Sequence, residues 1–308
     1  MNRKVKVFSL GLIGIGLTIT AGLIYRGFRV DMDQAYRRVA SGGKVIQTAC
    51  GPIEYSEWGQ GAPVLVVHGT GGGYDQGEFL ARELGGEFRW IAPSRFGYLR
   101  TPVPENASSI MQADAHACLL DALGIQRAAV VAYSAGGPSS LQFALRYPQR
   151  ITSLVMLSAV SHMVPARPSF MDQVYHNFVN DFFYWSFVHA SKPALLAALG
   201  VPAADQHELP QDQIAQAYTV LDDMVPMGAR RGGLIFDMTR LTTYDAAQIQ
   251  HIQTPTLVVH GRTDTLVPFE QGEFTAKMIP GAQLLPLEKG GHFAILFYPE
   301  ARETVGKF

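Results

Sequence analysis

The chain has 308 residues, of which 47% are hydrophobic and 17% are charged. This composition is typical of a globular enzyme with one large core or two modest ones. Its 25 basic and 26 acidic residues leave a formal net charge of -1. Because no global field favours nucleic acid or a strongly charged partner, we expect specificity to come from a local site.

The amino-terminal segment is more apolar than the rest. Residues 7–25 read VFSLGLIGIGLTITAGLIY and carry no ionisable group except the final tyrosine. A helix of this length reaches about 28 Å, which spans a bilayer. We predict a transmembrane anchor over residues 1–30 and a polar connector over 31–43, with the side of the membrane left open. A cleaved signal peptide is the main alternative, and would make the protein secreted or periplasmic; a buried core helix is a third.

The two cysteines lie in different kinds of segment. Cys50 falls in a strand pattern, and Cys118 falls on the apolar face of a helical pattern. Nothing in their number or spacing indicates a disulfide framework. We therefore predict two buried thiols.

From residue 44 onward, short apolar runs alternate with helical patterns. Residues 44–61 predict a hairpin, because Gly51-Pro52 divides two alternating runs. The later runs are rich in valine, isoleucine and leucine, which favours strands buried on both faces of a sheet. The alternation predicts an α/β fold with a mostly parallel sheet and an antiparallel hairpin at its start. The runs are PVLVVHG, RWIAP, AAVVAYS, ITSLVMLSA, TPTLVVHG and AQLLPLE.

One stretch interrupts this alternation. Residues 161–250 contain helical patterns, prolines and an aromatic cluster but no clear strand. We predict a helical cap over 161–250, inserted into a body formed by residues 44–160 and 251–308.

A serine stands where a strand pattern gives way to a helical one. The run AAVVAYS ends at Ser134, and small residues flank that serine. Such a turn projects its central residue above the carboxyl edge of a parallel sheet, where open α/β folds bind ligands. Ser134 is therefore the predicted nucleophile.

A serine nucleophile needs a base to accept its proton and an acid to orient that base. In this architecture the acid precedes the histidine in the chain. Asp264 follows the strand pattern TPTLVVHG, and His292, the only histidine after it, follows AQLLPLE. We predict a Ser134-Asp264-His292 triad, because all three residues follow strand ends on the same edge of the sheet.

A tetrahedral intermediate also needs hydrogen-bond donors for its oxyanion. The residue after the nucleophile, Ala135, provides one backbone N–H. We assign the second donor to Thr70, with Gly71 as the alternative, because both lie in the glycine-rich loop TGGGYDQG that follows a strand pattern. No Gly-Lys-Ser/Thr sequence follows this loop, so a nucleotide site is not expected.

Residues 45–308 resemble the α/β-hydrolase fold superfamily. The resemblance rests on HGTGG at 68–72, APSRFGYLRTP at 92–102, AYSAG at 132–136, GRTD at 261–264 and GHF at 291–293. It implies an eight-stranded sheet with helices on both faces, a helical cap between strands six and seven, and a Ser-Asp-His triad. It also implies that His68 shapes the oxyanion loop; we expect Arg95 to clamp backbone. Ala132 stands where relatives commonly have glycine.

The aromatic cluster bears on the substrate. Tyr175, Phe178, Phe182 and Trp185 share one face of a predicted helix. This stripe either packs the cap onto the body or lines an apolar pocket, and the two interpretations are compatible. We include all four, with Tyr133, as candidate pocket residues.

These observations predict a hydrolase that cleaves a carboxylic ester of a small, largely apolar substrate through an acyl-enzyme intermediate. Hydrolysis of a carbon–carbon bond by the same triad is one alternative, and a ligand-binding or signalling protein with little turnover is another. No motif with metal-ligand spacing occurs in the sequence. We expect no cofactor, no metal and no nucleic acid partner.

Overall fold

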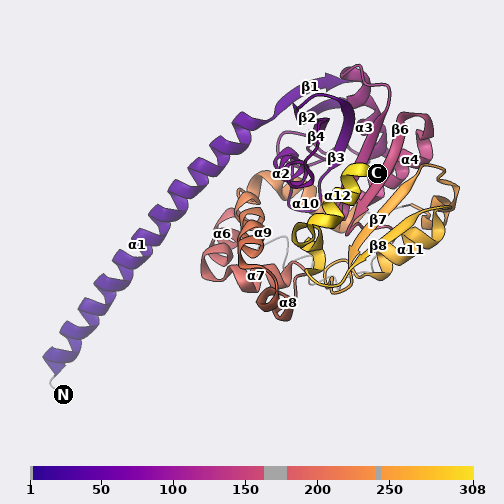
Figure 1. Ribbon diagram of the computed structural model, residues 1–308. Coiled ribbons are helices and arrows are strands. Elements are labelled where there is room, and N and C mark those ends of the chain that lie inside the picture. The colour runs from indigo at the N-terminus through magenta and orange to yellow at the C-terminus, as the bar shows by residue number, and fades with distance from the viewer. Residues whose placement is uncertain (1–2, 163–178, 241–243) are drawn as a thin grey trace.

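The computed structural model describes residues 3–162, 179–240 and 244–308, with the side chains of residues 3–13 left out. One eight-stranded sheet organises the body, in the order β1-β2-β4-β3-β5-β6-β7-β8 (Figure 1). This confirms the predicted sheet. The strands are β1 (Lys44–Thr48), β2 (Gly51–Trp58), β3 (Ala62–Val67), β4 (Phe88–Pro93), β5 (Ala128–Tyr133), β6 (Ile151–Leu157), β7 (Thr256–Gly261) and β8 (Gln283–Leu287).

Strand directions follow the sequence pattern. The β1–β2 hairpin is antiparallel, β2 pairs antiparallel with β4, and the remaining neighbours are parallel. The carboxyl ends of β3, β5, β7 and β8 therefore lie at one edge of the sheet. We call this edge the rim, and every predicted catalytic residue follows a strand that ends there.

The sheet separates two apolar cores. In β3, Leu65 and Val67 belong to one core while Val64 and Val66 belong to the other, because successive strand side chains point to opposite faces. Helices α3 and α4 cover the first face, and α2 and α12 cover the second. The helices of the body are α2 (Tyr74–Leu84), α3 (Ser109–Ala122), α4 (Gly137–Arg146), α11 (Glu270–Met278) and α12 (Pro299–Lys307), with short 3-10 helices η1 (Ser134–Gly136), η2 (Pro148–Arg150), η4 (Ala246–His251) and η5 (Gly291–Phe297).

The described part of the segment between β6 and β7 contains helices and their connections but no strand. Its helices gather beside one end of the sheet (Figure 1). We call this segment the helical insertion. Its elements are α6 (Asp181–Ala190), α7 (Lys192–Ala198), α8 (Ala203–Glu208), α9 (Gln211–Asp223), η3 (Gly228–Arg230) and α10 (Arg231–Arg240).

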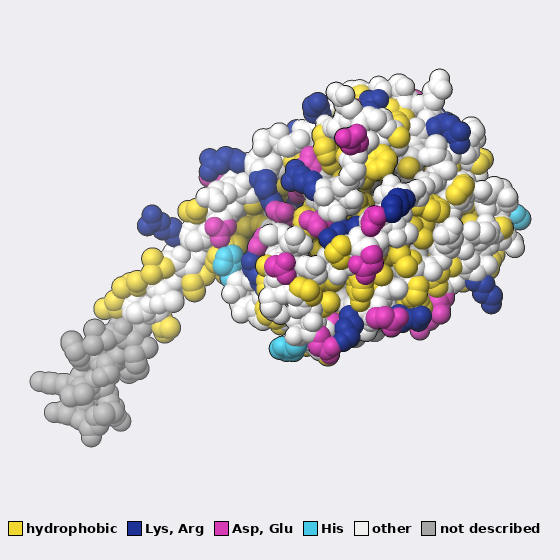
Figure 2. Space-filling view, viewed as in Figure 1, with side chains coloured by type: hydrophobic (Ala, Val, Ile, Leu, Met, Phe, Trp, Pro, Cys, Tyr) yellow, Lys and Arg dark blue, Asp and Glu magenta, His cyan; other side chains and the backbone are white. Residues whose placement is uncertain are grey.

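Helix α1 (Arg3–Gly42) covers both the predicted anchor and the predicted connector. Its amino-terminal part extends away from the body and carries exposed hydrophobic side chains such as Ile15 and Leu17 (Figures 1 and 2). Among the described residues, no helix combines the length and apolar character needed to cross a membrane. The predicted transmembrane anchor is therefore not supported, although residues 7–13 of that span lie outside the described side chains.

The carboxyl-terminal part of α1 packs on the helical insertion. Met32, Ala35 and Val39 are buried at helical spacing. Met32 and Ala35 form a small core with Trp185 of α6, and the Trp185 Nε1–H donates to Asp31 over 2.7 Å. The predicted polar connector is thus a docked helix.

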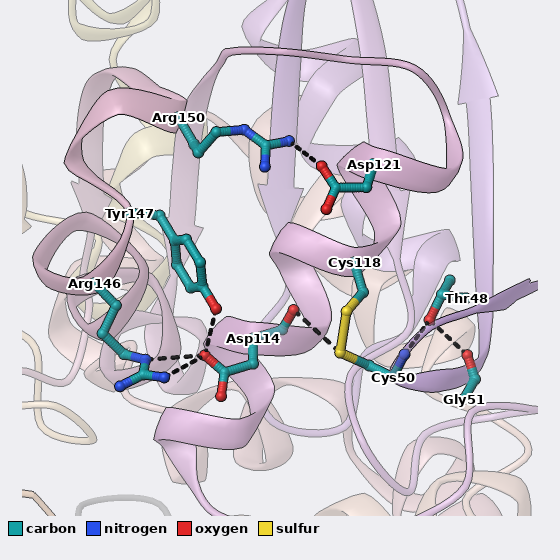
Figure 3. The surroundings of a disulfide bond; sticks show 9 residues. All are labelled: Thr48, Cys50, Gly51, Asp114, Cys118, Asp121, Arg146, Tyr147 and Arg150. Carbon is teal, nitrogen blue, oxygen red and sulfur yellow. Dashed lines mark hydrogen bonds and ion pairs between the residues drawn. A yellow bond between two sulfur atoms is a disulfide. The ribbon is translucent and has the colours of Figure 1, made fainter.

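The prediction of two buried thiols is wrong. Cys50 and Cys118 form a disulfide that joins the β1–β2 turn to α3, with Cα atoms 5.9 Å apart (Figure 3). Cys50 is exposed and Cys118 is half-buried. The helical pattern placed Cys118 on the apolar face correctly, but it could not show that the hairpin turn packs against that helix.

Candidate active site

Ser134 occupies a sharp turn between β5 and α4. It begins η1 and has φ +51°, one of the few non-glycine residues with positive φ in the described chain. This conformation is strained for a residue with a Cβ atom and is typical of functional turns. Small neighbours make room, since a Cβ on Gly69 would lie 2.8 Å from the Ser134 Cβ and one on Gly136 would lie 2.4 Å from the Val67 oxygen. Ala132, which stands where relatives commonly have glycine, is fully buried at the end of β5, so the fold has room for its methyl group.

Asp264 and His292 meet at the rim. The Nδ1 atom of His292 lies 2.7 Å from Oδ2 of Asp264, and both side chains are buried. Asp264 also accepts the backbone N–H groups of Leu266 and Val267, each at 2.9 Å. Burial acts to raise the pKa of Asp264, but the interactions with His292, with His260 and with the Val267 N–H outweigh burial and lower it from 3.8 to about 2. The carboxylate is therefore charged at neutral pH and holds Nδ1 of the imidazole.

The loop carrying His292 is fixed from two sides. Its backbone N–H donates to the Gly200 oxygen of the insertion over 3.0 Å, and its oxygen accepts the Tyr133 hydroxyl at 3.3 Å. The Tyr133 ring lies 5.2 Å from the imidazole, which places His292 beside the residue that precedes Ser134. A direct Ser134–His292 hydrogen bond is not found among the described residues, so the link between this pair stays a prediction.

The loop after β3 adjoins the serine. Gly71 has φ +74° and donates its N–H to the Tyr98 hydroxyl over 3.3 Å. This bond occupies the donor of Gly71, the alternative oxyanion residue. Thr70 is exposed, whereas its neighbours in the loop are buried. Thr70 is therefore the residue of this loop that a substrate at the rim can reach, while Ala135 lies directly after Ser134 at the start of the turn.

His68 and Arg95 hold the base of this loop. The Nδ1 atom of His68 lies 2.7 Å from the Gly69 oxygen, and Nε2 accepts the Arg95 backbone N–H at 2.9 Å. Burial and the nearby Arg95 charge hold the pKa of His68 well below its usual range. Arg95 Nε donates to the His68 oxygen over 2.9 Å. These contacts fit the loop-shaping role expected for His68 and the backbone clamp expected of Arg95.

Two charged residues of the insertion reach this loop, and neither was predicted from the sequence. Asp237 of α10 forms a bidentate ion pair with Arg95, with both N–O distances 2.7 Å. Arg230 donates to the Gly72 oxygen over 2.6 Å and pairs with Asp75. Asp237 is 142 residues from Arg95 in the chain, and no local motif marks a partner at that separation.

The candidate pocket residues separate into three groups. Tyr133 lines a small apolar cavity between α2, α9 and η5. Phe182 and Trp185 instead pack around Phe28 of α1, with ring centroids 5.3 and 5.6 Å from it. Tyr175 and Phe178 lie outside the described residues. The other residues around the cavity are Gln76, Phe79, Leu80, Val220, Phe293, Ile295 and Leu296.

Comparison with known proteins agrees with this arrangement. A sequence model of the alpha/beta hydrolase fold family matches residues 62–299. The chain is 28% identical over 272 residues to the uncharacterized hydrolase YcgS of Bacillus subtilis, covering 82% of this chain and 92% of that one. It is 27% identical to a 2-hydroxymuconate semialdehyde hydrolase of Pseudomonas putida, covering 84% and 90%. An alpha/beta hydrolase fold protein from Nakamurella multipartita superposes with a TM-score of 0.70 at 30% identity, covering 86% and 98%.

Proposed function

The chain belongs to the α/β-hydrolase fold family, and we propose that it is a serine hydrolase that cleaves a carboxylic ester of a small, largely apolar substrate. Ester cleavage is the reaction that a Ser-Asp-His triad performs without any further group. The mostly apolar side chains around the small cavity beside Tyr133 are the reason that we propose a largely apolar substrate.

In the proposed reaction, Ser134 Oγ attacks the acyl carbonyl while His292 Nε2 accepts its proton. Asp264 holds the opposite ring nitrogen and stabilises the imidazolium that forms. The N–H groups of Thr70 and Ala135 bind the oxyanion. Collapse of the tetrahedral intermediate breaks the ester C–O bond, and His292 returns the proton to the leaving alcohol. Water then hydrolyses the acyl-enzyme by the same route.

One observation carries this proposal: the 2.7 Å contact between His292 and Asp264 at the rim where Ser134 occupies its strained turn. The contact leaves Nε2 as the ring nitrogen that can serve Ser134. A histidine with a structural role would not need a buried carboxylate on one nitrogen and a strained serine nearby.

Labelling with a fluorophosphonate probe tests the nucleophile. We expect the wild type to be labelled and Ser134→Ala to be unlabelled. Ser158→Ala is a matched control, because Ser158 is also a buried serine with positive φ just after a strand; its labelling should persist. An unlabelled wild type would remove the nucleophile assignment and favour the ligand-binding alternative.

The P. putida relative favours a second candidate, hydrolysis of a carbon–carbon bond by the same residues, because it is named as a hydrolase of a semialdehyde rather than of an ester. A panel of p-nitrophenyl esters with increasing acyl length, run beside a dienol diketone substrate, separates the two. Ester turnover that depends on chain length supports our proposal. Turnover of the diketone alone would replace it with the second candidate.

We further propose that residues 161–250 act as a cap on a body formed by 44–160 and 251–308. The contact between Gly200 and the His292 backbone supports this division, as do the two charged residues of the insertion that reach the loop after β3. A cap so placed controls which substrates reach the rim.

The disulfide supports an oxidising compartment as the place where the body folds, since such bonds are rare in reducing cytosol. This agrees with the secreted or periplasmic alternative for the amino-terminal segment. Thiol alkylation followed by mass measurement, on protein made in oxidising and in reducing hosts, tests it. Two free thiols in protein from the oxidising host would contradict it.

A further inference from the structure

We propose that Asp237 of the helical insertion is a positioning residue that fixes the oxyanion donor Thr70. This inference rests on the proposed function, because it concerns how the same site stabilises its tetrahedral intermediate. We call residues 68–72 the oxyanion loop.

The first contact is direct. Thr70 Oγ1 donates to Asp237 Oδ2 over 2.8 Å. Thr70 is exposed, so packing alone does not hold its side chain. The Asp237 side chain, in contrast, is only 3% exposed. A buried carboxylate thus anchors the one exposed residue of the loop, and with it the orientation of the peptide group that bears the donor N–H.

The second contact runs through Tyr98. Its fully buried hydroxyl donates to Asp237 Oδ2 over 2.5 Å and accepts the Gly71 N–H at 3.3 Å. This bond holds the peptide group between Thr70 and Gly71. The backbone N–H of Gly71 is thereby turned toward Tyr98, and the Thr70 N–H remains the donor that can serve the substrate.

The third contact fixes Asp237 itself. Arg95 binds both carboxylate oxygens, and its Nε donates to the His68 oxygen at the start of the loop. Arg95 is 1% exposed, so both charges depend on this pairing. One carboxylate therefore connects Thr70 of the oxyanion loop with two side chains, Tyr98 and Arg95, that each contact that loop.

The insertion also holds the far end of the loop. Arg230, seven residues before Asp237, donates to the Gly72 oxygen and pairs with Asp75 at the start of α2. Because both residues come from the insertion, the position of that segment and the geometry of the oxyanion loop are coupled. Displacement of α10 would therefore move the donor as well.

Thr70→Val is the decisive variant. Valine has the shape of threonine and leaves the backbone N–H in place, so only the bond to Asp237 is lost. We expect kcat for a p-nitrophenyl ester to fall about 10- to 100-fold, with KM within about threefold, since small displacements of a positioned group have effects of this size. Thr70→Ser keeps the hydroxyl and should return kcat to within about threefold of the wild type.

Asp237→Asn tests the acceptor directly but leaves Arg95 without its charge partner, so we expect it to lower the folded fraction as well. Amide hydrogen exchange over residues 68–72 therefore accompanies the kinetics. We expect faster exchange in Thr70→Val and wild-type exchange in Thr70→Ser. Thr239→Val is the control, because Thr239 is an exposed threonine on the same helix whose hydroxyl bonds within α10; it should match the wild type in both measurements.

Wild-type exchange and wild-type kcat in Thr70→Val would overturn the inference. Equal losses in Thr70→Val and Thr70→Ser would overturn it as well, because the hydroxyl would then have no part in the effect. Failure of the proposed function looks different: the wild type would not react with the fluorophosphonate, while hydrogen exchange would still report whether Asp237 orders the loop.

Discussion

The rim of the sheet differs from the amino-terminal end of the body, meaning α1 and the β1–β2 hairpin, in how far its charged side chains are exposed to solvent. At the rim, the Arg95 and Asp237 side chains are 1% and 3% exposed. On α1, the Arg37 and Asp33 side chains are 72% and 63% exposed. Desolvation makes each rim partner depend on the other, whereas water supports each α1 partner alone. We therefore expect that removing either partner of the rim pair strongly lowers the free energy of unfolding. Removing either partner of the α1 pair should change it little.

Removing a buried charge should have the largest effect on stability. Arg95→Met leaves Asp237 buried without its cation, and we expect a loss of about 3 to 5 kcal/mol in the free energy of unfolding. Urea denaturation followed by circular dichroism measures it. Arg37→Met on α1 is the control and should change that free energy by less than about 1 kcal/mol. Similar losses in the two variants would show that the two regions are not held differently.

The disulfide is the strongest single constraint at the amino-terminal end. It closes a sequence separation of 68 residues, so replacing both cysteines with serine should cost about 2 to 4 kcal/mol of unfolding free energy, largely through a less restricted unfolded chain. The cost should disappear when wild type and variant are compared in a reductant that opens the bond. A variant as stable as the oxidised wild type would show that the hairpin does not need this link.

The rim was predictable from sequence because each of its residues follows a strand pattern directly. Once the alternation of strands and helices is recognised, a parallel sheet brings Ser134, Asp264 and His292 to one edge without any long-range information. Their contacts could not be predicted so simply. Asp237 pairs with Arg95 only because α10 packs over the loop after β3, and no periodicity within either segment shows this.

The amino-terminal end was harder to predict for the same reason. Cys50 and Cys118 each have a sound local interpretation as a buried thiol, and only the packing of the hairpin turn on α3 joins them. Of the predicted aromatic stripe, only Phe182 and Trp185 lie in a described helix, because α6 begins at Asp181. Their partner is α1, about 150 residues away. Apolar periodicity indicates that one face of a helix is buried, but it does not identify the element that packs on that face.

Acid should expose the contribution of the Asp264–His292 pair to stability. The pKa of Asp264 is lowered from 3.8 to about 2. Its ionised form therefore stabilises the fold above about pH 4, and that stabilisation is lost as the pH falls toward 2. The shift corresponds to about 2 kcal/mol. The stability difference between wild type and Asp264→Asn, measured by urea denaturation, should shrink by about this amount between pH 5 and pH 2. A constant difference would mean that His292 does not hold the carboxylate charged.

The smallest effect should come from a change at the contact between α1 and α6. This change tests whether the aromatic stripe only packs against α1 or also affects substrate turnover. Trp185→Phe keeps the ring beside Phe28 but removes the N–H bond to Asp31. We expect docking of α1 to weaken by about 1 kcal/mol, seen as faster tryptic cleavage after Arg29, while kcat for an ester stays within about twofold. Phe187→Leu, an exposed position on the same helix, should change neither quantity.

A fall in kcat of Trp185→Phe that matches the gain in tryptic cleavage would contradict this expectation. Substrate turnover would then depend on the docked α1, and the stripe would act on the pocket through the helical insertion as well as pack against α1. Unchanged turnover with faster cleavage would instead separate the two regions: α1 could leave α6 while Gly200 still held the His292 backbone and Asp237 still held Thr70.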